Sequence, residues 1–231
     1  GLDEIRDHAL LDDGIAIQTA IDSDADNKVA IYRLNPEGRY VWSQDLIAPA
    51  SGTQWGSSID LTPDGNTLVV GDPGNDDLGF DTGKVFVYNR IGTNFVLQET
   101  LKGVQTELSR RFGSKVSATN QFIAVSSYNG DITLPTTFDI DQDLNTIWDK
   151  DFTKFVNKVT DSGSVTIYER INGGYIFAEE LEYPEIKDSR FGENILINRN
   201  HMYVGCPRID TGTQNNGRLL DYSITKEDKA W

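Results

Sequence analysis

Short apolar runs separated by turn-forming residues recur along the whole chain. The stretch from Trp55 to Gly103 shows this pattern most clearly. Runs of five to eight residues that alternate, or that are continuously apolar and β-branched, are typical of strands. Pro63-Asp64-Gly65-Asn66 and Gly92-Thr93-Asn94 have the composition of tight turns. The stretch therefore predicts an antiparallel meander with strands at 57–61, 67–71, 84–89 and 95–101.

Most of this unit recurs elsewhere in the sequence. Further copies begin at Phe112-Gly113 and Phe191-Gly192, and a degenerate copy occupies the start of the chain. One meander cannot bury both of its faces, so its copies must stack. We expect one all-β repeat domain over 1–231, with approximate units 1–50, 54–103, 111–184 and 190–231. The third predicted strand of these units carries a tyrosine at the same place each time: Tyr32, Tyr88, Tyr168 and Tyr222.

The pattern resembles the FG-GAP repeats of β-propellers, the family that includes the integrin α-subunit head and many secreted bacterial and phage-encoded proteins. Trp55-Gly56, Phe112-Gly113 and Phe191-Gly192 match the FG element, and Gly71-Asp72-Pro73 and Gly205-Cys206-Pro207 match GAP. The third unit has Ser126-Ser127-Tyr128 instead of GAP, and the first unit has no FG. The resemblance implies a β-propeller of four-stranded antiparallel blades. The chain has length for about four blades, which either close into a ring or form part of a larger propeller or assembly.

Composition narrows the classes of partner. The formal net charge of −15 argues against nucleic acid, whose phosphates require clustered Lys and Arg. No run approaches the ~20 apolar residues of a membrane-spanning helix, so we expect no membrane insertion. The charged start of the chain predicts no targeting peptide. Cys206 is the only cysteine and predicts a small buried residue at a strand end. The composition agrees with an extracellular, cell-surface or virion location.

Acidic residues gather in the predicted connections between the second and third strands of each unit. Equivalent loops of propeller blades emerge on one side, so we expect one acidic face. Two runs place oxygen ligands at alternate positions, as Ca²⁺ sites commonly do. Neither run has the glycine of an EF-hand loop, and the family's calcium loops lie in a different connection. We therefore favour solvated acidic turns, with Ca²⁺ bound in at least one of the two runs as the alternative. The candidate ligands are Asp22, Asp24, Asp26, Asp139, Asp141, Asp143, Asn145 and Asp149.

An insertion at 130–160 interrupts the third unit. Loops of this length inside a compact domain are usually functional or disordered. The apolar residues of 146–156 follow helical spacing and predict a short amphipathic helix. Its apolar face either caps the propeller or binds a protein partner through Ile147, Trp148, Phe152 and Phe155.

The sequence offers little for catalysis. It has two histidines, His8 and His201, and no Ser-His-Asp order, Cys-His pair or phosphate-binding glycine loop. We therefore predict no enzymatic activity. The expected function is that of a protein-interaction or structural module, with proteins or other subunits of an extracellular or virion assembly as partners. The alternatives are a calcium-stabilised adhesion domain and a glycan-binding propeller that stacks sugars on Trp42, Tyr128 or Trp148.

Two further expectations concern residues near the FG elements. Trp55 occupies an FG position, so we expect it in the core rather than in a sugar site. Arg110, Arg111 and Arg190 precede FG elements, where we expect ion pairs with the acidic loops rather than recognition of an anion.

Overall fold

The computed structural model describes residues 4–10, 15–21, 28–49, 54–103, 110–129, 132–134, 146–148, 155–159, 163–182, 189–199, 201–208 and 217–224. All regular secondary structure in these ranges is β-strand. Within them, no helix is available to cross a membrane.

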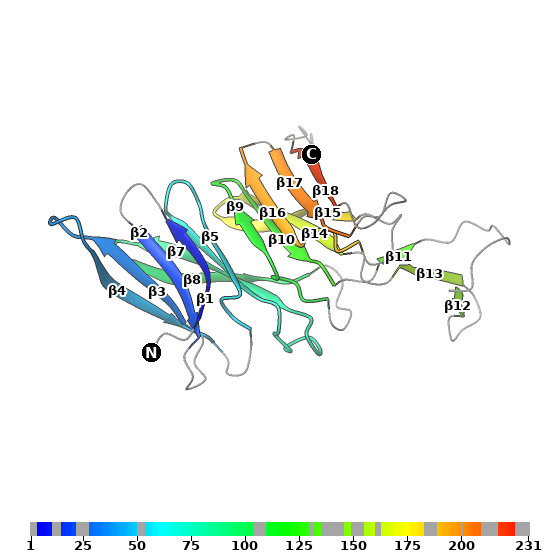
Figure 1. Cartoon of the computed structure of the whole chain (residues 1–231), viewed down its shortest axis with the longest axis horizontal. Helices are drawn as coiled ribbons and strands as arrows, with labels where there is room; N and C mark the ends of the chain where they lie inside the picture. The colour runs from blue at the N-terminus through cyan, green and yellow to red at the C-terminus, as the bar shows by residue number, and fades with distance from the viewer. Residues whose placement is uncertain are drawn as a thin grey trace.

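The strands form antiparallel sheets that follow the repeat units in order (Figure 1). The first sheet contains β1 (Glu4–Leu10), β2 (Ile15–Ile21), β3 (Lys28–Leu34) and β4 (Tyr40–Ile47). The second contains β5 (Ser58–Leu61), β6 (Thr67–Asp72), β7 (Lys84–Ile91) and β8 (Asn94–Leu101). The third contains β9 (Val116–Ala118), β10 (Phe122–Ser127), β14 (Ser164–Ile171) and β15 (Gly174–Glu182). The fourth contains β16 (Asn194–Asn198), β17 (His201–Cys206) and β18 (Arg218–Ser223).

The prediction of an all-β chain with four-stranded antiparallel sheets is confirmed for three units. In the fourth unit the described residues form three strands, and residues 225–231 lie outside the described ranges. The strands have the burial that their sequences predict. Every residue of β6 is buried, as its continuous apolar run requires, whereas β8 buries Phe95 and exposes its neighbours Val96 and Leu97.

The predicted equivalence of the tyrosines also holds. In each of the first three sheets the register between the third and fourth strands shifts by one residue just before Tyr32, Tyr88 or Tyr168. Tyr222 pairs with Met202 as Tyr168 pairs with Ile123, so the fourth sheet keeps the same alignment. A bulge repeated at one position shows that the sheets are copies of a single unit.

The sheets pack face to face in a row, and each gap between neighbours holds one apolar core. Ile31 and Leu68 lie in the first gap, Val87 and Ile123 in the second, and Phe122 and Met202 in the third. The first strands of successive sheets, β1, β5, β9 and β16, contact one another along one edge of the row. The first and fourth sheets lie at opposite ends of the row, and no closed ring is formed by the described residues (Figure 1).

Side-chain hydrogen bonds join these first strands, and all run in one direction. A polar side chain of the earlier sheet accepts from a backbone N–H of the later sheet. The bonds are Ile59 N–H to Asp7 Oδ2 (3.0 Å), Val116 N–H to Ser58 Oγ (3.2 Å), Ala118 N–H to Asp60 Oδ2 (2.7 Å) and Ile197 N–H to Ser117 Oγ (3.0 Å). Because backbone donors buried between sheets need partners, these bonds fix the alignment of each sheet on the next.

The insertion forms a small separate sheet, and the predicted helix over 146–156 is wrong. β11 (Ile132–Leu134), β12 (Thr146–Trp148) and β13 (Phe155–Val159) are antiparallel, with β13 in the middle. The register places Ile147 opposite Val156 and Trp148 opposite Phe155. Apolar residues near a turn satisfy helical spacing and cross-strand pairing equally well, and the β-branched residues here favour the strand.

Candidate functional site

The FG elements form the turns that lead into the second, third and fourth sheets. Trp55, Phe112 and Phe191 are fully buried, which confirms the core position expected for Trp55. Each is followed by a glycine with positive φ, namely 81° at Gly56, 94° at Gly113 and 86° at Gly192. A side chain would be strained in that conformation.

Two of the FG elements, Phe112-Gly113 and Phe191-Gly192, pack on the backbone of the preceding sheet. A Cβ on Gly71 would lie 2.1 Å from the carbonyl oxygen of Gly113, and one on Gly83 would lie 2.1 Å from that of Phe112. The next junction repeats the arrangement, with Gly163 as close to Phe191 and the Ser126 hydroxyl donating to the Gly192 carbonyl. The sheet-to-sheet junction therefore depends on glycine, or on a small hydroxyl, in the GAP position.

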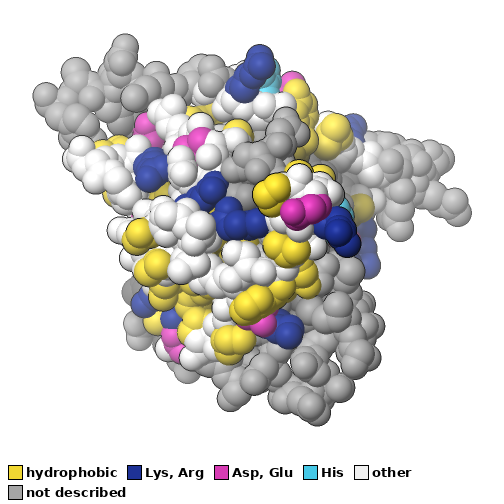
Figure 2. All heavy atoms as spheres, turned by 90° about the vertical axis from the view of Figure 1, so that its left-hand side faces the viewer, with side chains coloured by type: hydrophobic (Ala, Val, Ile, Leu, Met, Phe, Trp, Pro, Cys, Tyr) yellow, Lys and Arg dark blue, Asp and Glu magenta, His cyan; other side chains and the backbone are white. Residues whose placement is uncertain are grey.

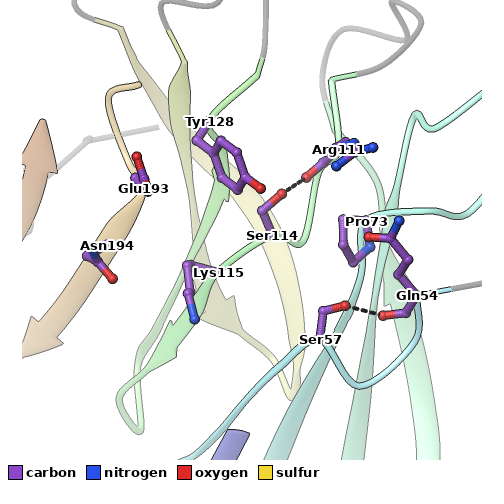
Figure 3. A pocket seen from close by; sticks show the side chains of 9 residues that line it. All are labelled: Gln54, Ser57, Pro73, Arg111, Ser114, Lys115, Tyr128, Glu193 and Asn194. Carbon is purple, nitrogen blue, oxygen red and sulfur yellow. Dashed lines mark hydrogen bonds between the residues drawn. The ribbon is translucent and has the colours of Figure 1, made fainter. Parts of the chain in front are cut away.

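This packing brings loops of three sheets around a pocket of about 310 Å³ (Figure 3). Lys115, Tyr128 and Ser114 lie in the middle of the view, between Glu193 and Asn194 on one side and Gln54, Ser57 and Pro73 on the other. Its volume is at the lower end of the range typical of small-ligand sites. The lining residues are Gln54, Ser57, Pro73, Arg111, Ser114, Lys115, Tyr128, Glu193 and Asn194.

The lining residues occupy equivalent positions in successive units. Ser57, Ser114 and Glu193 each follow the glycine of an FG element, and Pro73 and Tyr128 each follow a second strand. The turn geometry repeats as well. In each unit, the residue after the glycine donates its backbone N–H to the carbonyl of the residue three positions earlier. These bonds run from Ser57 to Gln54, from Ser114 to Arg111 and from Glu193 to Arg190. The pocket is therefore a product of the repeat and not of one irregular loop.

Arg111 is held in an uncommon conformation at the edge of this pocket. Its φ is 55°, and the corresponding residue of the next unit, Arg190, has a φ of 50°. The Arg111 N–H donates to the Asp81 carbonyl at 2.9 Å, and its own carbonyl accepts from Ser114. A left-handed non-glycine residue costs about 1 kcal/mol and persists where its surroundings fix it, often at functional sites.

Two of the three charged residues that line the pocket have partners. The Arg111 guanidinium lies 3.2 Å from the Asp81 carboxylate, and Glu193 lies 3.7 Å from Arg190. Lys115 is half-buried and forms no ion pair with any described residue. The pocket thus contains one cation that no described acidic side chain matches.

The predicted ion pairs of the arginines are found in part. Arg111 pairs with Asp81, which belongs to an acidic loop, as expected. Buried Arg110 pairs instead with Glu180 of β15, at 3.6 Å, and Arg190 pairs with Glu193 within its own turn. Glu180 and Glu193 both lie outside the predicted acidic loops.

Polar uncharged groups complete the lining. The side chains of Gln54, Tyr128 and Asn194 make no hydrogen bond to the described residues. Amide side chains present both a donor and an acceptor, and a tyrosine hydroxyl can do either. These groups match the hydrogen-bonding pattern of a peptide backbone or of a polyhydroxylated ligand.

The predicted calcium ligands, from Asp22 to Asp26 and from Asp139 to Asp149, all lie outside the described residues. Within the described ranges no group of three or more His, Cys, Asp or Glu side chains could hold a metal. In the acidic loop of the second sheet, acidic side chains form a hydrogen bond and an ion pair with neighbouring residues. Asn75 donates to Asp72 at 3.2 Å, and Lys84 pairs with Asp77, which lowers the pKa of Asp77.

Three of the four predicted partner-binding residues lie on strands of the insertion, and the fourth lies outside the described residues. Ile147 and Trp148 lie on β12 and Phe155 on β13, as parts of a hairpin rather than of a helix, and Phe152 lies outside the described residues.

Other residues that the sequence singled out lie away from the pocket. His201 is exposed and pairs with Asp221 at 3.1 Å. Cys206 is fully buried, as predicted, and burial raises the pKa of its thiol to about 11. Trp42 is 62% exposed on the first sheet. That sheet carries further exposed hydrophobic residues: Leu10, Leu34, Tyr40, Val41 and Ile47. Figure 2 views the end of the molecule that lies on the left in Figure 1, and hydrophobic side chains gather on this surface.

Sequence reasoning missed most of the pocket. It named Arg111 and Tyr128 but not Gln54, Lys115 or Asn194. A signal was present, because these residues flank FG elements at matching offsets. It was overlooked because the acidic loops dominate the charge pattern of the chain.

No protein-family model and no curated protein matches the sequence. Among solved structures, the chain is similar to Pyrococcus horikoshii acylaminoacyl peptidase, with 12% identity and a TM-score of 0.44 over 95% of this chain. It is also similar to acylaminoacyl peptidase in complex with Z-Gly-Gly-Phe-chloromethyl ketone, with 11% identity and a TM-score of 0.47 over 96% of this chain. The chain spans 32% of the length of each.

This comparison corrects one prediction. The chain was expected not to be an enzyme, yet both of these similar structures are peptidases, so the prediction is withdrawn. Similarity at this level assigns no catalytic residue to this chain.

Proposed function

We propose that the chain is a protein-interaction module whose sheets are arranged as in an FG-GAP propeller, and that the pocket between three of them binds an extended segment of a partner protein. One observation carries the proposal. Equivalent positions of three successive units converge on a concave site in which Gln54, Tyr128 and Asn194 have unused hydrogen-bonding groups. Repeat proteins commonly bind partners through surfaces built from the same position of several units.

The packing of the FG elements supports the propeller arrangement. Phe112 and Phe191 each insert between neighbouring sheets against a glycine of the preceding one, and the first strands line one edge of the row. This is the arrangement expected of blades around an axis. Further sheets would be needed to complete a ring, which favours membership of a larger propeller or assembly. An extracellular or virion location remains part of the proposal and is supported by composition alone.

A partner protein finds more support than a glycan. Sugar sites rely on aromatic platforms, and Tyr128 is the one aromatic residue among the described residues that line the pocket. Of the tryptophans considered for stacking, Trp55 is buried and Trp42 lies on the first sheet, away from the lining residues. The amides of Gln54 and Asn194 suit peptide groups, which need a donor and an acceptor at each residue.

Selection from a library of random linear peptides tests the proposal. Peptides are enriched on the wild-type chain and then measured on the double variant Tyr128→Ala, Asn194→Ala. We expect at least about tenfold weaker binding, since truncating central contacts of an interface typically costs more than 1 kcal/mol. The matched control is Tyr40→Ala, Asn35→Ala on the first sheet. Equal binding to the wild type and to the pocket variant, or failure to enrich any peptide, would contradict the proposal.

A further inference from the structure

We infer that the segment bound in the pocket carries an acidic side chain, and that the Lys115 ammonium holds its carboxylate. This inference rests on the proposed function and specifies the chemistry of its ligand. It follows from how the charges around the pocket are matched.

Lys115 is the charged lining residue that forms no ion pair with any described residue. Arg111 and Glu193, the other charged lining residues, are paired with Asp81 and Arg190. Lys115 is half-buried, and an anion that enters the pocket can form a charge-assisted hydrogen bond with its ammonium. A neutral ligand offers only an acceptor of ordinary strength.

The Lys115 ammonium lies in a chain whose overall charge is strongly negative. The formal net charge is −15, so the long-range field repels acidic partners from most of the surface. An acidic segment is tolerated only where a local cation offsets that field. Lys115 provides such a position, and it does so at the junction of three sheets.

The neighbouring groups define how many acidic residues fit. Glu193 lines the same pocket, so a second carboxylate near it would meet a like charge that Arg190, at 3.7 Å, only partly compensates. Tyr128 lies beside Lys115 in the middle of the pocket, and its hydroxyl can donate to the same carboxylate, whereas the Ser114 hydroxyl already donates to the Arg111 carbonyl (Figure 3). We therefore expect one acidic residue flanked by neutral residues rather than a run of acids.

Titration of two small peptide mimics, followed by amide NMR spectra of the whole chain, tests this inference. The probes are N-acetyl-glutamate methylamide and its neutral counterpart N-acetyl-glutamine methylamide. We expect the amide signals of Ser114, Lys115, Tyr128 and Asn194 to shift with both probes. The acidic probe should bind about fivefold or more tightly, a modest gain because the site is open to solvent.

The variant Lys115→Gln should abolish the preference for the acidic probe while leaving the spectrum of the fold intact. Lys102→Gln, which removes the same charge from an exposed lysine outside the pocket, should leave the preference unchanged. The preference should also weaken with added salt.

The outcomes separate this inference from the proposed function. Equal shifts with both probes would overturn the acidic preference and leave peptide binding in place. An absence of shifts at the pocket with either probe would remove both. Methyl glucuronide is the third probe. Binding of this sugar acid through Lys115, without binding of the glutamate probe, would overturn the inference in favour of an acidic glycan.

Discussion

The carboxylate of Asp60 accepts a hydrogen bond from the backbone N–H of Ala118, 2.7 Å away, across the gap between the second and third sheets. The Ser117 hydroxyl donates to the same oxygen at 3.2 Å, and the Leu61 N–H donates to the other carboxylate oxygen at 2.8 Å. A single side chain thus satisfies donors of two neighbouring sheets. Asp7 plays the same part between the first and second sheets, where it accepts from Ser58 and Ile59.

The pH dependence of stability should report on Asp60. Burial raises the pKa of Asp60 above its ordinary value of 3.8, more than the hydrogen bonds from Ala118, Leu61 and Ser117 lower it. The folded state therefore binds this proton more tightly than the unfolded state, and stability is lost as pH rises through the window above 3.8. Asp60→Asn should cost about 1 to 3 kcal/mol at pH 4, by losing an acceptor, and less at pH 7.

Urea unfolding of both proteins between pH 3.5 and pH 7.5 measures this difference. Asp64→Asn is the matched control with the opposite sign. Burial raises the pKa of Asp64, but hydrogen bonds from Thr62 and Asn66 outweigh it and lower the pKa overall. Its variant should therefore lose more stability, relative to the wild type, as pH rises. A stability gap for Asp60→Asn that widens with pH would contradict the assignment.

Substitution of equivalent glycines should have unequal effects. Gly71→Ala places a Cβ 2.1 Å from the Gly113 carbonyl oxygen, whereas Gly205→Ala, at the same position of the fourth sheet, meets its nearest atom at 3.4 Å. We expect a loss of about 2 to 4 kcal/mol in unfolding free energy for the first change and less than about 1 kcal/mol for the second. Thermal and urea unfolding measure both, and similar losses would show that the junction can relax.

The thiol of Cys206 should be inert in the folded chain. It is fully buried and its pKa is about 11, so little thiolate is present or accessible at pH 8. Labelling with a disulfide reagent should be at least about 100 times slower in buffer than in denaturing urea. Rapid stoichiometric labelling of the native protein would place the fourth sheet in a more open state than described here.

Calcium binding by the acidic runs at 22–26 and 139–149 remains a prediction. If either run binds Ca²⁺, saturation at about 100 times the dissociation constant should stabilise the fold by about 2.7 kcal/mol relative to the chelated protein. Thermal melts in EDTA and in excess calcium measure the effect. The double variant Asp141→Asn, Asp143→Asn should remove the stabilisation that comes from Ca²⁺ bound by the run at 139–149. An unchanged midpoint favours solvated acidic turns.

The sequence predicted the repeated meander because its signals are local. Turn residues such as Asp64-Gly65, the β-branched run of β6 and the repeated tyrosines each specify their own segment, and register follows from alternation. Trp55 and Cys206 were placed in the core for the same reason. The order of strands within each sheet also follows from short connections.

The pocket and the insertion were not predictable in this way. Lys115 and Asn194 lie about 80 residues apart and meet only because successive FG elements pack on the preceding sheets. Whether Arg111 is free or paired depends on the position of Asp81, which sequence spacing does not give. In the insertion, Ile147 and Phe155 fit a helix and a hairpin equally well, so only pairing with β11 decides between them.

The hydrogen bonds between first strands give the row of sheets a polarity. At β16 the residue that corresponds to Ser117 is Leu196, whose side chain cannot accept, so the acceptors on this strand are Asn194 and Asn198 at its two ends. The two outer faces of the row are consequently not interchangeable: a neighbour of β1 must bring acceptors, and a neighbour of β16 finds none at the centre of the strand. Further sheets could therefore be added in this manner in one orientation, and two copies cannot join symmetrically through the same bonds.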